Sequence, residues 1–381
     1  MATVERILIV GGGIAGLTLA TALHRHGFGA ELVERSKVWH ATGAGILLHA
    51  NGMRMLRALG VGEAVEQAGA VVRRWGFCDQ QGELLCDTNL EELWGEVGPC
   101  IGIERPRLQQ VLLAGAAAVP CRLGTSVLSL TQDEQRVSVG FSDGNASEYD
   151  LVVGADGIAS TVRRLTLGAA SPAYTGQMVW RSLVPTRPLG LTTLQFVLGE
   201  GCFFGLVPMG DGYTYGFGYT YGLGNVTEPR FHDPLEGRLE RLRKRFAAFG
   251  GPVPEYLASL SCDEQLHCGS IEWVELDRWH SSRVVLIGDA AHASMPLMGE
   301  GGCMAMEDAL VLAEVLREAE TVENALDTYV ARRRPRAAWV QQESRAVAQS
   351  FLLPPAVRNA ALRERGDQMI QDRFGPLRSA V

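Results

Sequence analysis

The sequence has no cysteine pair in C-x-x-C spacing among its 8 cysteines, and no histidine-rich spacing of the kind that binds zinc. We therefore expect neither a disulfide framework nor a metal site. Unpaired cysteines suit a reducing compartment, so we expect a cytoplasmic protein.

Long apolar runs are also absent. A helix needs roughly 18 consecutive apolar residues to cross a bilayer, and the longest uncharged run, Ile7 to His24, is interrupted by the glycines between Gly11 and Gly16. Only Met1 to Glu5 precede the first apolar run, so we expect no signal peptide and no membrane partner.

An excess of basic residues is missing as well. The formal net charge is -8, which argues against a general nucleic-acid binder, because such proteins gain affinity from cationic contacts to phosphates. The basic runs Arg241 to Arg245 and Arg332 to Arg336 stand among acidic residues and are interpreted as solvated helix faces. Hydrophobic residues make up 46%, which excludes disorder, and 381 residues predict two or three folded units at about 150 residues each.

What the sequence does contain is glycine placed directly after strands. The apolar run Arg6 to Val10 leads into Gly11, Gly13 and Gly16 in G-x-G-x-x-G spacing, then into a helical pattern and a second strand, Ala30 to Glu34. This order is typical of a dinucleotide site. The helix N-terminus meets the pyrophosphate, and the carboxylate that ends the second strand binds ribose hydroxyls.

Two further apolar runs end in glycine and aspartate. Leu151 to Gly154 leads into Asp156 and Gly157, and Val284 to Ile287 leads into Gly288-Asp289. The second run continues through a proline and a glycine cluster into a helix with an apolar face. Because glycine lets the backbone approach a ligand closely, we expect a ligand beside this cluster.

Aromatic residues gather in a different unit. Between Gln195 and Tyr221 lie 8 of the 27 aromatic residues. From Tyr213 to Tyr221 they alternate with threonine and glycine, which predicts a strand with one aromatic face. Gly210 to Gly212 would fold this strand back on Phe203 to Pro208 as a hairpin. The acidic segment Val71 to Pro99 is interpreted as irregular.

The three glycine motifs, in this order, resemble the single-component FAD monooxygenases of the para-hydroxybenzoate hydroxylase family, the class A flavin monooxygenases. The resemblance implies an α/β fold with a Rossmann-like FAD-binding domain of the glutathione reductase type, an interleaved β-sheet substrate domain and C-terminal helices. We expect the FAD-binding domain in residues 1–75, 101–170 and 276–322, the substrate-binding domain in 76–100 and 171–275, and the C-terminal helices in 323–381.

The resemblance also implies the chemistry. Non-covalently bound FAD would be reduced by NADH or NADPH and would react with O2 to a C4a-hydroperoxyflavin, which hydroxylates an electron-rich ring. No second G-x-G-x-x-G turn follows a strand, so no separate nicotinamide domain is expected. The partner would be a small aromatic substrate, and the protein a monomer or homodimer.

By the same resemblance, Glu34 would bind the ADP ribose and Asp289 the ribityl chain, unless Asp289 only caps the next helix. Arg35 follows Glu34 and is taken as a surface residue of this site, not as a contact for an NADP phosphate. Arg105 would contact the flavin, with Arg107 as the alternative. The residues expected at the FAD and NAD(P)H site are Gly11, Gly13, Ile14, Ala15, Gly16, Glu34, Arg35, Gly45, Ile46, Arg105, Asp156, Gly157, Arg163, Gly288, Asp289, Pro296, Gly299, Gly301 and Gly302.

An arginine fork suits a carboxylate or phenolate, so Arg181 predicts an acidic aromatic substrate unless it pairs with an internal acid. Tyr215 is the candidate for a hydrogen bond to the substrate. His49 is a candidate base, although a packed histidine fits the sequence better. The candidate catalytic residues are thus Tyr215, His49 and Arg181. The residues expected to wall the pocket are Trp180, Arg181, Phe203, Tyr213, Tyr215, Phe217 and Pro296, whose aromatic members are alternatively core.

Two other functions share these motifs. A flavin-dependent epoxidase or reductase of an apolar, isoprenoid-like substrate would need an apolar pocket. An FAD-containing binding protein would hold a small molecule without consuming NAD(P)H.

Overall fold

The computed structural model describes residues 4–39, 44–168, 171–220 and 233–381. One half of the molecule is built on a six-stranded sheet whose neighbours are parallel except for the first pair. In spatial order its strands are β18 (His280–Ser281), β19 (Val284–Leu286), β12 (Leu151–Gly154), β1 (Ile7–Val10), β2 (Ala30–Glu34) and β8 (Cys121–Leu123). Parallel strands covered on both faces are continuous apolar runs, which explains why the three strands followed by glycine motifs were predictable.

The three glycine motifs follow β1, β12 and β19, which are neighbours in this sheet. Because the carboxyl ends of parallel strands meet at one edge, motifs far apart in the sequence come together there. The sheet and its helices share one hydrophobic core. The helices around it are α1 (Ile14–Arg25), α2 (Ala50–Ala58), α3 (Gly62–Ala68), α5 (Arg105–Gly115), α6 (Thr161–Leu167) and α10 (Gly301–Glu318).

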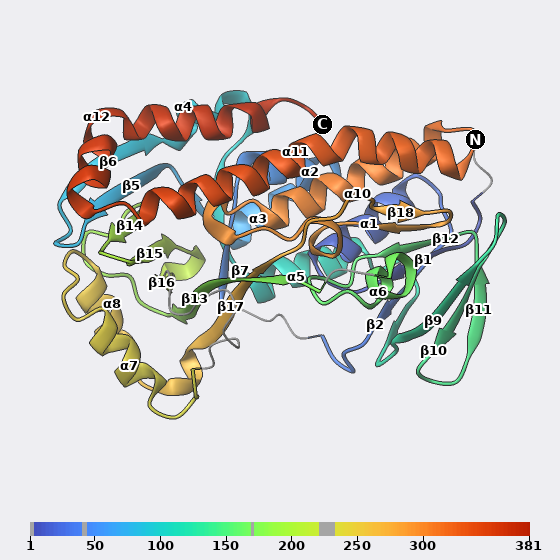
Figure 1. Ribbon diagram of the computed structural model, residues 1–381, viewed down its shortest axis with the longest axis horizontal. Helices are drawn as coiled ribbons and strands as arrows, with labels where there is room; N and C mark the ends of the chain where they lie inside the picture. The colour runs from blue at the N-terminus through green and yellow to red at the C-terminus, as the bar shows by residue number, and fades with distance from the viewer. Residues whose placement is uncertain (1–3, 40–43, 169–170, 221–232) are drawn as a thin grey trace.

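A seven-stranded sheet forms the other half, antiparallel except between β14 and β5. Its strands in spatial order are β17 (His267–Trp273), β13 (Ala173–Val184), β16 (Thr214–Thr220), β15 (Cys202–Pro208), β14 (Leu194–Leu198), β5 (Arg74–Asp79) and β6 (Leu84–Asn89). One face packs against α7 (Arg238–Arg245) and α8 (Val253–Ser259), which lie at the lower left of Figure 1. The opposite face is aromatic.

Two small sheets complete the strands. β3 (Gly45–Leu48), β7 (Cys100–Glu104) and β4 (Ala70–Val72) form one, and β11 (Ala146–Tyr149), β10 (Val137–Phe141) and β9 (Val127–Gln132) project at the far end of the molecule (Figure 1). The remaining short elements are α4 (Leu90–Trp94), α9 (Asp289–His292), and the 3-10 turns η1 (Gly95–Val97), η2 (Gly210–Gly212), η3 (Asp263–Gln265), η4 (Pro296–Met298) and η5 (Gly375–Arg378).

Two long helices tie the halves together. α11 (Val322–Phe351) runs along the long axis of the molecule beside α10, and α12 (Pro355–Phe374) folds back over β6 (Figure 1). None of the described helices is both long and apolar enough to cross a membrane.

The interpretation of Val71 to Pro99 as irregular is wrong, because the segment holds β4, β5, β6 and α4. Trp75 and Phe77 of β5 are buried on the aromatic face, whereas Arg74 pairs with Asp87 of β6 at 2.5 Å on the exposed face. The charges belong to the outer side of an edge hairpin, and its parallel partner β14 is far away in the sequence. The predicted aromatic strand is confirmed as β16, and Tyr221 lies outside the described residues.

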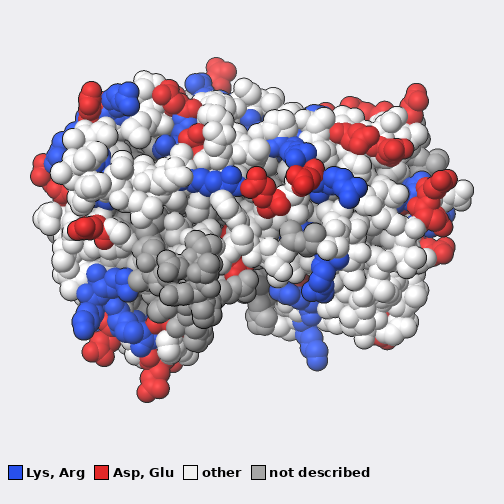
Figure 2. Space-filling view, in the orientation of Figure 1, with Lys and Arg blue, Asp and Glu red and all other residues white. Residues whose placement is uncertain are grey.

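Acidic and basic side chains are interspersed over the face shown in Figure 2, with the largest basic group over α7. Arg241 and Arg238 of this helix pair with Asp233 at 2.7 and 3.5 Å. The basic run of α7 is therefore at least partly neutralised locally.

Candidate active site

A cavity of about 600 Å³ lies between the carboxyl edge of the parallel sheet and the aromatic face of the seven-stranded sheet. Its volume is in the range typical of cofactor and substrate sites. Among the predicted cofactor residues, those lining it are Gly13, Ile14, Ala15, Gly45, Ile46, Arg105, Gly157, Asp289, Pro296, Gly299, Gly301 and Gly302.

The turn between β1 and α1 depends on two glycines. Gly11 has φ +109°, and a Cβ on Gly16 would lie 1.9 Å from the Gly11 carbonyl oxygen. At Gly13, the N-cap of α1, a Cβ would meet nothing within 4 Å, and no side chain caps the helix. The free amides at the beginning of α1 therefore face open space, as an anion-binding helix end does.

Glu34 stands beside this turn at the end of β2. Its Oε2 accepts from the Gly12 backbone N–H and its Oε1 from that of Ser36, both at 2.8 Å. Each carboxylate oxygen can accept a second hydrogen bond, so capacity for a ribose hydroxyl remains. Glu34 and Arg35 do not line the cavity itself.

On the other side of the cavity, Asp289 is exposed and its carboxylate has no hydrogen-bond or ion-pair partner among the described residues. Gly301 and Gly302 begin α10 without a capping side chain, so amides of its first turn are also free. Gly45 packs against the ring of Tyr215, where a Cβ would lie 2.6 Å from the nearest ring atom.

These features fit FAD. Two uncapped helix ends suit a pyrophosphate and an anionic flavin edge, and the free carboxylate of Asp289 suits ribityl hydroxyls. Both glycine clusters let the backbone reach a flat ligand without side-chain collision.

Asp156 and Arg163 support the site from outside the cavity. Asp156 accepts hydrogen bonds from Ser160 Oγ and the Thr161 N–H at 2.5 and 2.7 Å, which caps α6. Arg163 is 2% exposed and donates to the carbonyl of Ala290 at 2.9 Å. The structure thus gives both residues a role in holding the loops, and of this motif only Gly157 of the predicted contacts lines the cavity.

At the aromatic end, one row of residues crosses three strands. In the pairing register Arg181 of β13 stands opposite Phe217 of β16 and His267 of β17. Directly opposite residues project to the same face about 5 Å apart, and all three line the cavity. The Phe217 ring lies over Gly205, where a Cβ would come within 2.2 Å of it.

Two guanidinium groups share this end. Neither Arg105 nor Arg181 has a side-chain hydrogen bond or ion pair with the described residues. Burial lowers the pKa of Arg105, and the charge of Arg181 lowers it further, whereas Tyr215 raises it. Burial also lowers the pKa of His267, and the charge of Arg181 lowers it further. The cavity therefore has a cationic end.

Of the predicted aromatic walls, Phe203, Tyr215 and Phe217 line the cavity, whereas Trp180 and Tyr213 do not. Trp180 is next to Arg181 on a strand, so it projects to the opposite face. There its Nε1 donates to Asp233 at 2.6 Å. Tyr213 precedes β16, at the end of η2. Sequence reasoning missed the lining residues Phe196, Tyr219 and His267.

Comparison of the chain with known proteins identifies its family. Residues 5–198 and 269–344 match the family model described as FAD binding domain. The chain belongs to the FAD binding domain family. The resemblance to class A flavin monooxygenases, the α/β fold and FAD as cofactor are thereby confirmed.

Relatives in the FAD binding domain family are named as monooxygenases. The chain is 36% identical over 340 residues to the aurachin C monooxygenase/isomerase of Stigmatella aurantiaca, covering 88% of this chain and 87% of that protein. It is 32% identical over 359 residues to the 3-amino-4-hydroxybenzoate 2-monooxygenase of Streptomyces cremeus, covering 92% and 88%. The crystal structure of Klebsiella pneumoniae HpxO with FAD and uric acid has a TM-score of 0.88 at 26% identity and covers 98% and 96% of the two chains. The protein is a flavoprotein monooxygenase of the aromatic hydroxylase type.

The glycine turn between β1 and α1 allows the effects of two substitutions on FAD binding and on stability to be predicted. Gly13→Ala should weaken FAD binding at least about tenfold, the value of one charge-assisted hydrogen bond, because the methyl group would enter the space over the free amides of α1. The apoprotein should unfold at an unchanged temperature, because φ at Gly13 is an ordinary -79°. Gly16→Ala should instead destabilise the apoprotein itself. FAD titration and thermal unfolding of both variants test this, and unchanged FAD affinity in Gly13→Ala would contradict it.

His49 is the N-cap residue of α2 and is one of the residues that line the large cavity. Its ring is 1% exposed and packs 4.9 Å from that of Phe374, with Trp75 and Trp94 also near. Burial lowers its pKa to about 4. Because the imidazole is enclosed by these aromatic rings, the structure favours packing over base catalysis.

A buried polar network lies under the beginning of α10. Arg333 of α11 is fully buried and binds Glu307 Oε2 at 2.6 Å and Asp308 Oδ1 at 2.7 Å. Asp308 Oδ2 in turn accepts from the Gly288 backbone N–H at 2.8 Å and contacts His292 Nε2 at 2.6 Å. The interpretation of Arg332 to Arg336 as a solvated face is therefore wrong for Arg333. Glu307 and Asp308 stand in a helix that is otherwise apolar between Gly301 and Val315 except for Glu314, and this was the signal for buried, paired charges.

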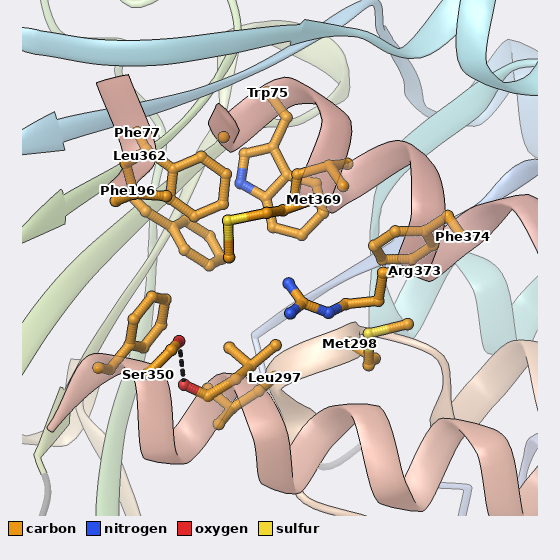
Figure 3. Close-up of a pocket in the computed structure, with 14 residues that line it drawn as sticks. Trp75, Phe77, Phe196, Leu297, Met298, Ser350, Leu362, Met369, Arg373 and Phe374 are labelled. Carbon is orange, nitrogen blue, oxygen red and sulfur yellow. Dashed lines mark hydrogen bonds between the residues drawn. The ribbon is translucent and has the colours of Figure 1, made fainter. Parts of the chain in front are cut away.

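Behind the aromatic wall lies a second cavity of about 20 Å³, the apolar annex (Figure 3). It shares Trp75, Phe196, Leu297 and Met298 with the large cavity. In Figure 3 Trp75, Phe77, Phe196 and Met369 gather at the top, and the Arg373 side chain extends from the right toward the centre. The volume of the annex suits about one methyl-sized group.

Proposed function

We propose that the protein uses NAD(P)H and O2 to hydroxylate a small acidic or phenolic aromatic substrate. The observation that carries the proposal is Arg181, a guanidinium without an ion-pair partner among the described residues, set in an aromatic wall. An unpaired arginine fork of this kind binds carboxylates and phenolates bidentately. The named ligands of two relatives, a hydroxybenzoate and uric acid, are acidic ring compounds of this class.

The residues of the chain would bind and orient the substrate. Arg181 holds its anionic group, and Arg105 adds positive charge on the FAD side. Phe203 and Phe217 supply faces for stacking and exclude water. Tyr215, whose hydroxyl has no partner among the described residues, donates to a ring substituent. FAD, when bound, supplies the electron transfer and oxygen chemistry.

His267 is the proton acceptor in this proposal. Its lowered pKa keeps the imidazole neutral at pH 7, and it stands opposite Arg181 in the register. Loss of a phenolic proton raises the electron density of the ring, which favours attack by an electrophilic oxygen.

The experiment is anaerobic mixing of the holoprotein with NADPH or NADH while the flavin absorbance is followed. Aromatic acids, their amides and apolar aromatics are added in parallel. We expect bleaching to be accelerated by an acid and not by its amide. Acceleration only by apolar compounds would contradict the proposed substrate class.

A second candidate is an epoxidase or reductase of an apolar substrate. The wall shared by the two cavities favours it, because Trp75, Phe196, Leu297 and Met298 offer such a substrate a hydrophobic surface. The same mixing experiment separates the two candidates.

A further inference from the structure

Glu300 is a buried carboxyl with an incomplete set of partners. It is the N-cap residue of α10 and 1% exposed. Its Oε2 accepts from Asn51 Nδ2 at 2.9 Å, and its Oε1 has no hydrogen-bond partner among the described residues. The side chain does not cap its own helix. A buried carboxylate normally has a cation or several strong donors, so one amide and the weak donor Cys303 are too little for a full charge.

Neighbouring charges leave no cation for Glu300. The same Asn51 amide also donates to Glu307 Oε1 at 3.1 Å. Glu307 is already bound by Arg333 at 2.6 Å and by Arg336 at 2.8 Å. Arg333 also binds Asp308, at 2.7 Å, and its remaining N–H group donates to the Met304 carbonyl. Two arginines thus serve two carboxylates, and Glu300 is the third acid of the group without an ion pair.

We propose that Glu300 is held as a neutral, proton-bearing carboxyl, and that its neutrality leaves the positive end of α10 to act on bound FAD. A negative charge at this position would cancel the half-charge of the helix end that lines the cavity at Gly301 and Gly302. Glu300 would then act indirectly, by leaving the partial positive charge at the N-terminus of α10 uncompensated. The inference needs only the FAD of the family and does not depend on the proposed substrate.

Burial raises the pKa of Glu300 from 4.5 to about 8, in agreement with this geometry. The other groups around it do not titrate in the same range. Burial lowers the pKa of His49 to about 4 and raises the pKa values of the Cys100 and Cys303 thiols above the normal range. The titratable and charged groups that act on Glu300, from α10, α11 and β7, are Cys303, Glu307, Arg336 and Cys100.

The test compares the midpoint reduction potential of bound FAD in the wild type and Glu300→Gln from about pH 6 to about pH 9.5. Glutamine keeps the shape and stays neutral. We expect equal potentials at the acidic end. Above pH 8 the ionised wild type should favour reduced FAD at least tenfold less than the variant, about 30 mV lower for a two-electron couple. Glu323→Gln, an exposed acid in the first turn of α11, should follow the wild type at every pH.

Urea unfolding of the same proteins gives a readout independent of the flavin. A carboxyl whose pKa is raised in the folded state binds its proton more tightly there, so stability falls as pH rises from 4.5 toward 8. Glu300→Gln should lack this fall and become the more stable protein above pH 8. A potential difference that is the same at all pH values, or parallel unfolding profiles, would overturn the proposal.

Discussion

Replacing Arg333 by methionine is expected to lower the free energy of unfolding by about 3–5 kcal/mol, the usual cost of removing one partner from a buried ion pair. Methionine fills most of the volume but leaves Glu307 and Asp308 buried with less compensation. Asp308 also holds the Gly288 N–H at 2.8 Å, directly before Asp289. We therefore expect weaker FAD retention together with the loss of stability, measured by urea unfolding and FAD titration.

Arg332→Met is the matched control, one residue earlier on α11. Its side chain is 28% exposed and pairs with Glu314 at 3.2 Å. An ion pair this open to solvent contributes less than about 1 kcal/mol. A similarly small loss in Arg333→Met would contradict the importance of the buried network.

Replacing Arg181 by methionine should weaken the binding of an acidic aromatic substrate by about 10- to 150-fold, the equivalent of about 1.5–3 kcal/mol for hydrogen bonds to a charged group. The amide of the same substrate should bind almost as well as before, because it brings no charge to the fork. Arg181→Lys should fall between, since lysine keeps the charge and loses the planar fork. The measurement is the concentration dependence of substrate-accelerated flavin reduction.

Arg164→Met replaces an exposed residue of α6 and serves as the control. The binding of the acid and of its amide should both be unchanged. Equal losses for the acid and the amide in Arg181→Met would show that Arg181 shapes the pocket and does not recognise charge.

The cofactor half of the site was predictable because its signals are local. At Gly11, Gly13 and Gly16 the strand, the turn and the helix are adjacent in the sequence. Backbone geometry demands glycine at Gly11 and Gly16, and at Gly13 the missing side chain leaves open space for a ligand. The same holds for Gly288 and for the glycines before α10. Their meeting at one edge follows from parallel strands, whose carboxyl ends coincide.

The substrate half depended on pairings that one sequence does not reveal. Trp180 and Arg181 are adjacent on a strand, so only one of them can face the cavity. A shift of the strand register by one residue would exchange the two faces. His267 reaches Arg181 only through the pairing of β17 with β13. Likewise the partners of Arg333 lie on another helix, and only their burial shows that they are paired.

The placement of β1 between β2 and β12 has a consequence for the growing chain. During synthesis the glycine turn after β1 emerges long before β12 and β19, and long before α10. The pyrophosphate turn must therefore wait, with one strand edge unpaired, for contacts of large sequence separation, which form slowly. The cofactor site, which takes residues from both ends of that separation, is therefore complete only after the sheet and α10 have assembled.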